Sequence, residues 1–336
     1  MHFLWEYLFF LVKSITVVLA ILAVLATVIA LASKNKGEKG RLEIKKLNEC
    51  FDETRDEMRN VIFSKERLKE FKKDAKLEKK RSKKVLDDPN KKRTFVLAFE
   101  GDMKASAVKN LREEITAILQ VATINDEVVL RVESAGGMVP HYGLAASQLK
   151  RLRDARIPLT AIVDRVAASG GYLMASVADK ICAAPFAIIG SIGVIAQLPN
   201  FHKLLKKHNI DVEQIQAGEY KRTLTVFGEN TSKGRAKFQQ DIDETHELFK
   251  RFVTENRSKL DIDKVATGEY WYGTRAIELG LVDRLITSDD YLFNASQTGD
   301  VFEVSYKSKK KLAQKLSQSI KTVFENVFTT SSPIQS

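Results

Sequence analysis

The sequence predicts an α/β domain preceded by a single transmembrane helix and a charged spacer, which is helical or disordered. Residues 14–33 contain no charged side chain, and residues 34–93 hold 22 Lys and Arg against 13 Asp and Glu. From Arg93 onward, short apolar runs alternate with amphipathic segments. Strands that alternate with helices of about ten to fifteen residues indicate parallel crossover units.

The apolar N-terminal segment, residues 1–33, is interpreted as an uncleaved membrane anchor. A helix over its uncharged stretch would span about 30 Å, the thickness of the hydrocarbon core of a bilayer. Aromatic residues such as Trp5 and Tyr7 precede this stretch and suit a membrane interface. No small-residue cleavage site favours the alternative of a signal peptide. We therefore expect contact with membrane lipid.

Composition limits the other partners and cofactors. Most of the net charge of +11 falls in the spacer, residues 34–92, and the rest of the chain is nearly balanced. This argues against a basic surface that binds nucleic acid. The two cysteines, Cys50 and Cys182, form neither a metal motif nor a disulfide framework. No phosphate loop is present, so we expect no cofactor, metal or nucleotide.

The α/β domain is predicted to cover residues 93–287. Buried strands are expected at 94–101, 126–134 and 157–164, and helices at 108–122 and 144–155. The apolar run 180–199 is broken by Pro185, Gly190, Gly193 and Pro199, which favours buried strands and turns over a second membrane span.

Further predicted elements are a short helix near 200–209, a strand at 210–216 and a long amphipathic helix at 233–257. Residues 288–336 are interpreted as a polar, basic tail that is peripheral or disordered.

The turn around Ser169 is the strongest candidate for chemistry. It follows the strand at 157–164 and precedes Gly170 and Gly171, after which a small-residue helix is expected. A hydroxyl at a helix start lies near free backbone N–H groups that favour developing negative charge. The glycines would let another backbone approach closely. Ser169 is therefore a candidate nucleophile, although most Ser-Gly-Gly turns are only turns.

A serine nucleophile needs a base, and two types remain open. None of the five histidines is marked out by its context, and His141 is the one nearest the turn in sequence. A lysine can do the same task when it is neutral, which burial favours. Lys221 differs from the other lysines because it lies at a junction outside the charged runs.

Five segments in this order resemble the SppA-type signal-peptide-peptidase family of serine–lysine peptidases. They are ESAGG at 133–137, VAASGGY at 166–172, APFAIIGSIGV at 184–194, AGEYKRTLT at 217–225 and ATGEYWYGTRAIELGLVD at 266–283. The similarity also covers the anchor and the spacer.

The resemblance implies a role for each matching residue. Ser169 would be the nucleophile and Lys221 the general base, with Ser191 orienting the lysine. The backbone N–H groups of Gly136 and Gly170 would form the oxyanion hole. The family commonly has Ser-Pro-Gly-Gly where this chain has Ala135 as the second residue. This loosens the turn but leaves both glycine amides in place.

The resemblance also implies a ClpP/crotonase-like fold and assembly into a homo-oligomeric ring. The expected function is that of a membrane-anchored serine endopeptidase that cleaves membrane-derived, signal-type or unfolded peptides through an acyl-enzyme.

The expected location is a bacterial inner membrane, and two arguments about the side oppose each other. The resemblance favours a catalytic domain in the periplasm. The lysines that follow the anchor, such as Lys34 and Lys36, favour the cytoplasm.

Two alternatives to the peptidase remain at this stage. One is a crotonase-like enzyme that acts on acyl-CoA, and the pairing of Ser169 with Lys221 argues against it. The other is a membrane-bound oligomeric scaffold without catalysis.

Overall fold

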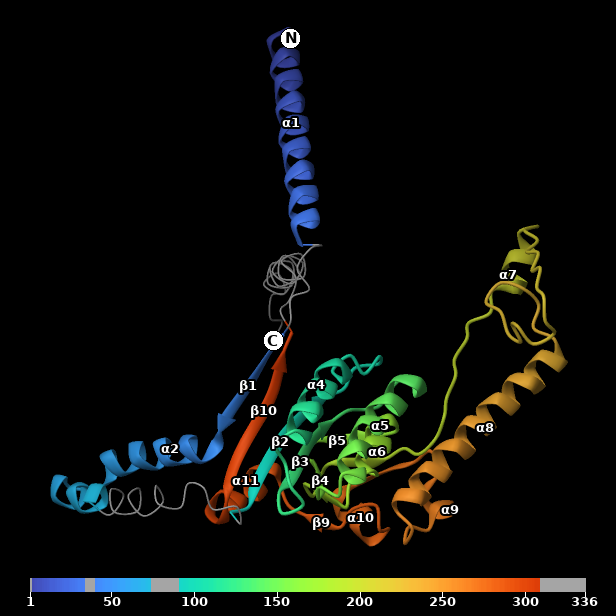
Figure 1. Ribbon diagram of the computed structural model, residues 1–336. Helices are drawn as coiled ribbons and strands as arrows, with labels where there is room; N and C mark the ends of the chain where they lie inside the picture. The colour runs from blue at the N-terminus through green and yellow to red at the C-terminus, as the bar shows by residue number, and fades with distance from the viewer. Residues whose placement is uncertain (1, 34–39, 74–90, 309–336) are drawn as a thin grey trace, which may run out of the picture. The chain divides into compact units, whose positions relative to one another are not determined.

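The computed structural model describes residues 2–33, 40–73 and 91–308 (Figure 1). The chain divides into two compact units, Met1–Arg41 with Lys307–Ser336, and Leu42–Tyr306. The second unit combines parallel strands with connecting helices, which confirms the predicted mixed α/β class.

The first unit contains helix α1, His2–Ser33. Its described aromatic side chains, such as Trp5 and Phe10, are exposed. Within the described residues, no helix combines the length and the apolar character that a membrane crossing requires. The predicted transmembrane helix is therefore not confirmed.

A seven-stranded sheet forms the centre of the second unit, in the order β1-β10-β2-β3-β4-β6-β9. From β10 to β9 every described pair is parallel. The strands are β1 (Arg41–Lys46), β10 (Asp300–Lys307), β2 (Arg93–Glu100), β3 (Glu127–Glu133), β4 (Leu159–Val163), β6 (Lys180–Ala183) and β9 (Arg284–Leu285).

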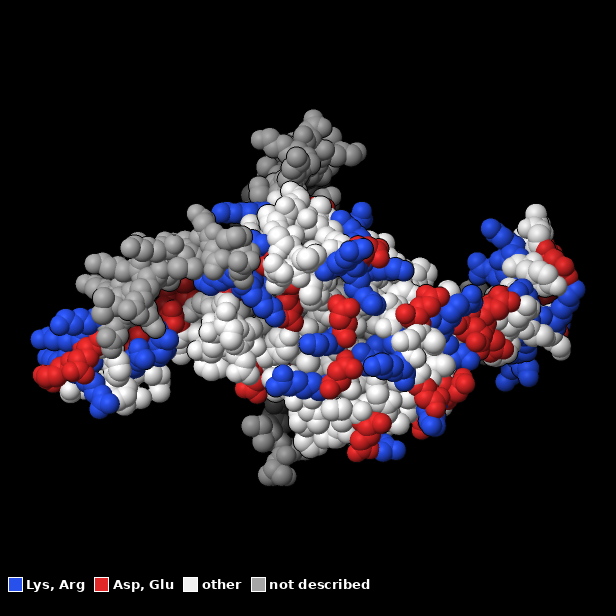
Figure 2. Space-filling view, turned by 60° about the horizontal axis from the view of Figure 1, so that its bottom comes forward, with Lys and Arg blue, Asp and Glu red and all other residues white. Residues whose placement is uncertain are grey.

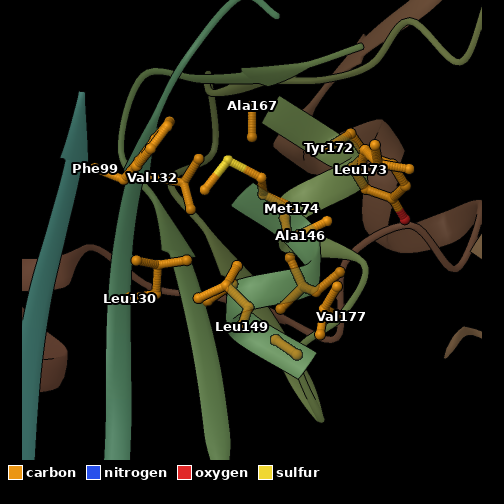
Figure 3. Close-up of a cluster of buried hydrophobic side chains, with 14 of the residues drawn as sticks. Phe99, Leu130, Val132, Ala146, Leu149, Ala167, Tyr172, Leu173, Met174 and Val177 are labelled. Atoms are coloured by element: carbon orange, nitrogen blue, oxygen red, sulfur yellow. The ribbon is translucent and has the colours of Figure 1, made fainter. Parts of the chain in front are cut away.

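Helices cover both faces of this sheet because its strands alternate between two apolar cores. Along β2, Leu97 and Phe99 enter the larger core, whereas Val96 enters the smaller one. The larger core lies under α4 (Val108–Leu119), α5 (Val139–Asp154) and α6 (Gly170–Ala175). Figure 3 shows part of it, where Leu130 and Val132 of β3 face Leu149 and Met174. The smaller core lies under α11 (Ser288–Thr298) and α2 (Leu47–Ile62).

A small second sheet joins the candidate site to the rest of the domain. Its strands β5 (Val166–Ala168), β7 (Ile188–Gly190) and β8 (Tyr270–Tyr272) lie in that order. Ser134, directly after β3, forms a parallel bridge with Ala167 of β5. The ends of β3, β5 and β7 therefore meet at one place.

The remaining helices include one long element. They are α7 (His202–Lys207), α8 (Ser232–Asn256), α9 (Ile262–Val265) and α10 (Gly273–Glu278). In α8 only Val253 is fully buried, and most of the helix is exposed. On the face shown in Figure 2, acidic and basic side chains are interspersed.

The folded domain extends beyond the predicted boundaries at both ends. The predicted tail begins with α11 and β10, and β10 pairs with β2 inside the sheet. The predicted spacer contributes β1 and α2, whose Leu47 packs against the smaller core. Residues 210–216 were expected to form a strand but are irregular. Ile215 is 95% exposed there, and no described strand pairs with this segment.

Candidate active site

Ser169 occupies a strained turn between strand β5 and helix α6. Its backbone angles are φ 51° and ψ −118°, a region that glycine adopts easily and a serine adopts only at a cost. The turn is held because the Ser169 N–H donates to the Gly190 carbonyl at 2.8 Å. The Ser169 side chain makes no capping hydrogen bond to α6. Strain of this kind concentrates at functional sites, and a strand–turn–helix serine is a known way to expose a nucleophile.

The glycine turn after β3 lies directly against Ser169. A Cβ atom built on Gly136 would lie 2.8 Å from both the Gly170 nitrogen and the Ser169 Cβ. Gly136 also has φ +91°, so both the space and the backbone require glycine. Gly136, Ser169 and Gly170 therefore lie close together.

The two glycines of this turn differ in whether their backbone N–H groups are hydrogen-bonded. The Gly136 N–H donates to the Ser134 Oγ at 3.1 Å. No hydrogen bond of the Gly137 N–H is found among the described residues, and Gly137 lines a cavity together with Ser169 and Gly170. Gly136 is the glycine that the resemblance assigned to the oxyanion hole. Its N–H is bound to the hydroxyl of Ser134, two residues earlier in the sequence.

The cavity beside Ser169 has a volume of about 250 Å³. Its walls come from α5, α6, α8 and the segment after β7. Most of its side chains are apolar, and they are Val139, Leu173, Val194, Leu248, Phe249 and Phe252. The long helix α8 thus contributes three of these side chains, a role that its amphipathic pattern alone did not reveal.

The turn that carries Ser191 is joined to the turn of Ser169 by a backbone hydrogen bond. Ser191 directly follows Gly190, whose carbonyl accepts the Ser169 N–H, and it too has a positive φ of 51°. His246 on α8 lies 3.2 Å through its Nε2 from the Ile192 carbonyl. This histidine contacts the turn that carries Ser191.

Lys221 is not close to Ser169 within one chain. Its neighbour Glu219 forms an ion pair with Lys233 in the first turn of α8, whereas Ser169 shares its cavity with Thr245 and Leu248 further along that helix. At 1.5 Å per residue, roughly 20 Å of helix separates the two places. Figure 1 agrees, since the segment around α7 lies at the end of α8 remote from α6. Lys221 itself is exposed.

Comparison with known proteins gives the family. Residues 2–149 match the model described as Peptidase family S49 N-terminal, and residues 151–301 match Peptidase family S49. A protein named "Probable protease SohB" from Haemophilus influenzae is 52% identical over 316 residues, covering 91% of this chain and 90% of that protein. The protein of the same name from Buchnera aphidicola subsp. Schlechtendalia chinensis is 47% identical over 304 residues, covering 88% of this chain and 100% of that protein.

The fold, the family models and these relatives together define a peptidase. The chain belongs to peptidase family S49, and the resemblance to the SppA-type family is confirmed. Family membership favours the peptidase over the acyl-CoA enzyme and the scaffold.

Proposed function

We propose that the protein is a serine endopeptidase with Ser169 as its nucleophile. The observation that carries this proposal is the strained turn of Ser169, which opens on an apolar cavity beside a glycine backbone. In the reaction, the Ser169 Oγ would attack the carbonyl carbon of a peptide bond, and its proton would pass to a base. The C–N bond would then break, with that proton going to the leaving amine, and water would hydrolyse the acyl-enzyme.

The oxyanion of this reaction needs two backbone donors. Gly170 follows the nucleophile and supplies one N–H group. For the other donor we place Gly137 where the resemblance placed Gly136, because the Gly136 N–H is already bound to Ser134. Removing one such donor typically costs about 3 kcal/mol of transition-state stabilisation.

Lys221 is the proposed base, and its distance from Ser169 requires a second copy of the chain. The segment between β7 and α8 carries many exposed apolar side chains, including Ile195 at 81% and Ile215 at 95%. Such a surface is typical of a protein interface. In a ring, this segment of one copy would bring Lys221 to the Ser169 of the next copy, beside Ser191. Removal from water there favours the neutral amine that a base requires.

The substrates are proposed to be unfolded, signal-type or membrane-derived peptides bound in an extended conformation. The cavity would accept an apolar side chain next to the scissile bond. Gly143 on α5 lines this cavity, and a Cβ atom there would meet no atom within 4 Å. The absence of a side chain at Gly143 leaves room for the substrate.

Labelling with a fluorophosphonate, which reacts with activated serines, tests this function. The wild-type protein should be labelled, whereas Ser169→Ala and Lys221→Ala should not. Ser147→Ala is a matched control, because Ser147 lines the same cavity but donates to the Gly143 carbonyl within α5. Labelling that persists in Ser169→Ala would show that the nucleophile has been misassigned.

Membrane attachment is a separate part of the proposal. It rests on the uncharged residues 14–33 of α1. The protein should stay in the membrane fraction after alkaline carbonate washing, and recovery in the supernatant would exclude a spanning anchor. We place the catalytic domain on the periplasmic side. A reporter fused after Ser336 that is active only in the cytoplasm would reverse this placement.

A further inference from the structure

A chain of buried hydrogen bonds lies beneath the glycine turn at the active site. The Gly136 N–H donates to the Ser134 Oγ at 3.1 Å, and this oxygen lies 2.6 Å from the Tyr142 hydroxyl. The Tyr142 hydroxyl in turn donates to the Asp102 carbonyl at 2.8 Å. Because the only hydroxyl proton of Tyr142 goes to Asp102, the proton between the two side chains must come from Ser134. Every donor in the chain therefore has an acceptor.

The side chains of Ser134 and Tyr142, which form these hydrogen bonds, are fixed by their surroundings. Ser134 is 2% exposed and Tyr142 is 0% exposed. A Cβ atom on Gly101 would collide with both hydroxyls, and one on Gly170 would collide with the Tyr142 ring. Burial raises the pKa of Tyr142, so the phenol keeps its proton. The glycines at positions 101 and 170 thus leave the space that these two side chains occupy.

Ser134 also connects the turn to the strand that carries the nucleophile. Its carbonyl accepts the Ala168 N–H at 3.0 Å, and its N–H donates to the Val166 carbonyl at 2.9 Å. One residue therefore holds strand β5 through its backbone and Gly136 through its side chain. The position of Gly137 relative to Ser169 depends on both contacts.

We propose that Ser134 and Tyr142 are positioning residues, which set the glycine turn so that the Gly137 N–H can bind the oxyanion formed on attack by Ser169. This inference rests on the proposed function. Ser134 does not line the cavity beside Ser169, and Tyr142, whose side chain does line it, directs its hydroxyl to Ser134 and the Asp102 carbonyl. They act by holding the Gly136 N–H away from the cavity, which fixes the direction of the next peptide group.

Tyr142→Phe removes the hydroxyl and retains the ring. With a peptide p-nitroanilide that has an apolar residue before the scissile bond, we expect kcat to fall by about ten- to a hundredfold, since small misplacements at a reacting centre have effects of this size. KM should change by less than about twofold, because the apolar cavity is retained. Ser134→Ala should have the same effect, and the double variant should lose little more, as for residues that act as one unit.

Tyr172→Phe is the matched control. Tyr172 is also fully buried, and its hydroxyl donates to the Leu281 carbonyl at 3.0 Å, away from the glycine turn. Both tyrosine variants should lose similar thermal stability, but Tyr172→Phe should keep the kcat of the wild type. Wild-type kcat in Tyr142→Phe, or equal losses in the two variants, would refute the positioning role.

A second measurement does not depend on turnover. Hydrogen exchange of a peptide spanning residues 131–141 should be faster in Tyr142→Phe than in the wild type and unchanged in Tyr172→Phe. Unchanged exchange in Tyr142→Phe would refute the chain of hydrogen bonds itself. If the two variants show this exchange pattern but the wild-type protein shows neither labelling nor hydrolysis, the proposed function is refuted and the chain of hydrogen bonds is not.

Discussion

At the scale of single residues, the site is built from backbone conformations that cost free energy. Ser169 and Ser191 both have φ of 51° without being glycine, and the hydrogen bond from the Ser169 N–H to the Gly190 carbonyl links their two turns. A strained conformation persists only where the surrounding structure holds it. Here β5, β7 and α6 supply that support, and the strain keeps the serine hydroxyl out of the regular helix.

Replacing Ser169 by glycine should separate stability from activity. Ser169→Gly relieves the strain and should raise the free energy of unfolding by about 1 kcal/mol. Ser169→Ala keeps the strain and is the control. Both variants should lose fluorophosphonate labelling. Chemical denaturation measures the difference, and a glycine variant no more stable than the alanine variant would show that the turn is not strained.

At the scale of elements, β10 is held in the sheet by contacts with segments far away in sequence. The Asn48 side chain accepts the Val301 N–H at 2.8 Å and donates to the Gly299 carbonyl at 2.9 Å. At the other end, the Tyr306 N–H donates to the Glu114 carboxylate on α4 at 2.7 Å. These side-chain contacts fix the strand that follows the last helix.

The Glu114 contact should make stability depend on pH. Burial raises the pKa of Glu114 to about 6 from 4.5, despite the opposing hydrogen bond from Tyr306. The unfolded chain therefore releases this proton at lower pH than the folded chain does. The contribution of Glu114 is complete below about pH 4.5 and is lost as pH rises through about 6.

Glu114→Gln keeps an acceptor for Tyr306 but cannot ionise. Relative to the wild type, its free energy of unfolding should rise by about 2 kcal/mol between pH 4 and pH 7. Glu113→Gln is the control, because Glu113 is exposed on the same helix. Denaturation curves at several pH values measure both. A constant difference between Glu114→Gln and the wild type would contradict the raised pKa.

At the scale of the whole molecule, helix α8 sets the distance between Ser169 and Lys221 within one chain. Its later turns line the cavity of Ser169, and its first turn holds the segment of Lys221 through the ion pair of Lys233 with Glu219. A helix cannot bend to bring its two ends together. The proposed pair of Ser169 and Lys221 would therefore need a neighbouring copy.

Mixing two inactive variants tests this arrangement. Ser169→Ala and Lys221→Ala should each be inactive alone. Co-expressed in equal amounts, they should recover about a quarter of the wild-type activity, because half of the intact serines meet an intact lysine by chance. Either variant mixed with the double variant should stay inactive. No recovery in mixed oligomers would mean that the pair forms within one chain.

The sequence by itself determined the features that depend on local patterns. Apolar spacing located α4, α7 and α8, and the Ser-Gly-Gly turn marked Ser169, because helix periodicity and glycine requirements are properties of neighbouring residues. The similarity of five short segments indicated the family. These inferences needed no knowledge of which segments meet in space.

The tertiary structure decided what depends on distant partners. The polar pattern of residues 300–307 resembled a tail, and only pairing with β2, about two hundred residues earlier, makes it a strand. The distinction between Gly136 and Gly137 depends on the direction of one N–H group toward Ser134. The separation of Lys221 from Ser169 follows from the straightness of α8. Hydrogen-bond direction and helix geometry are three-dimensional properties, and sequence spacing does not contain them.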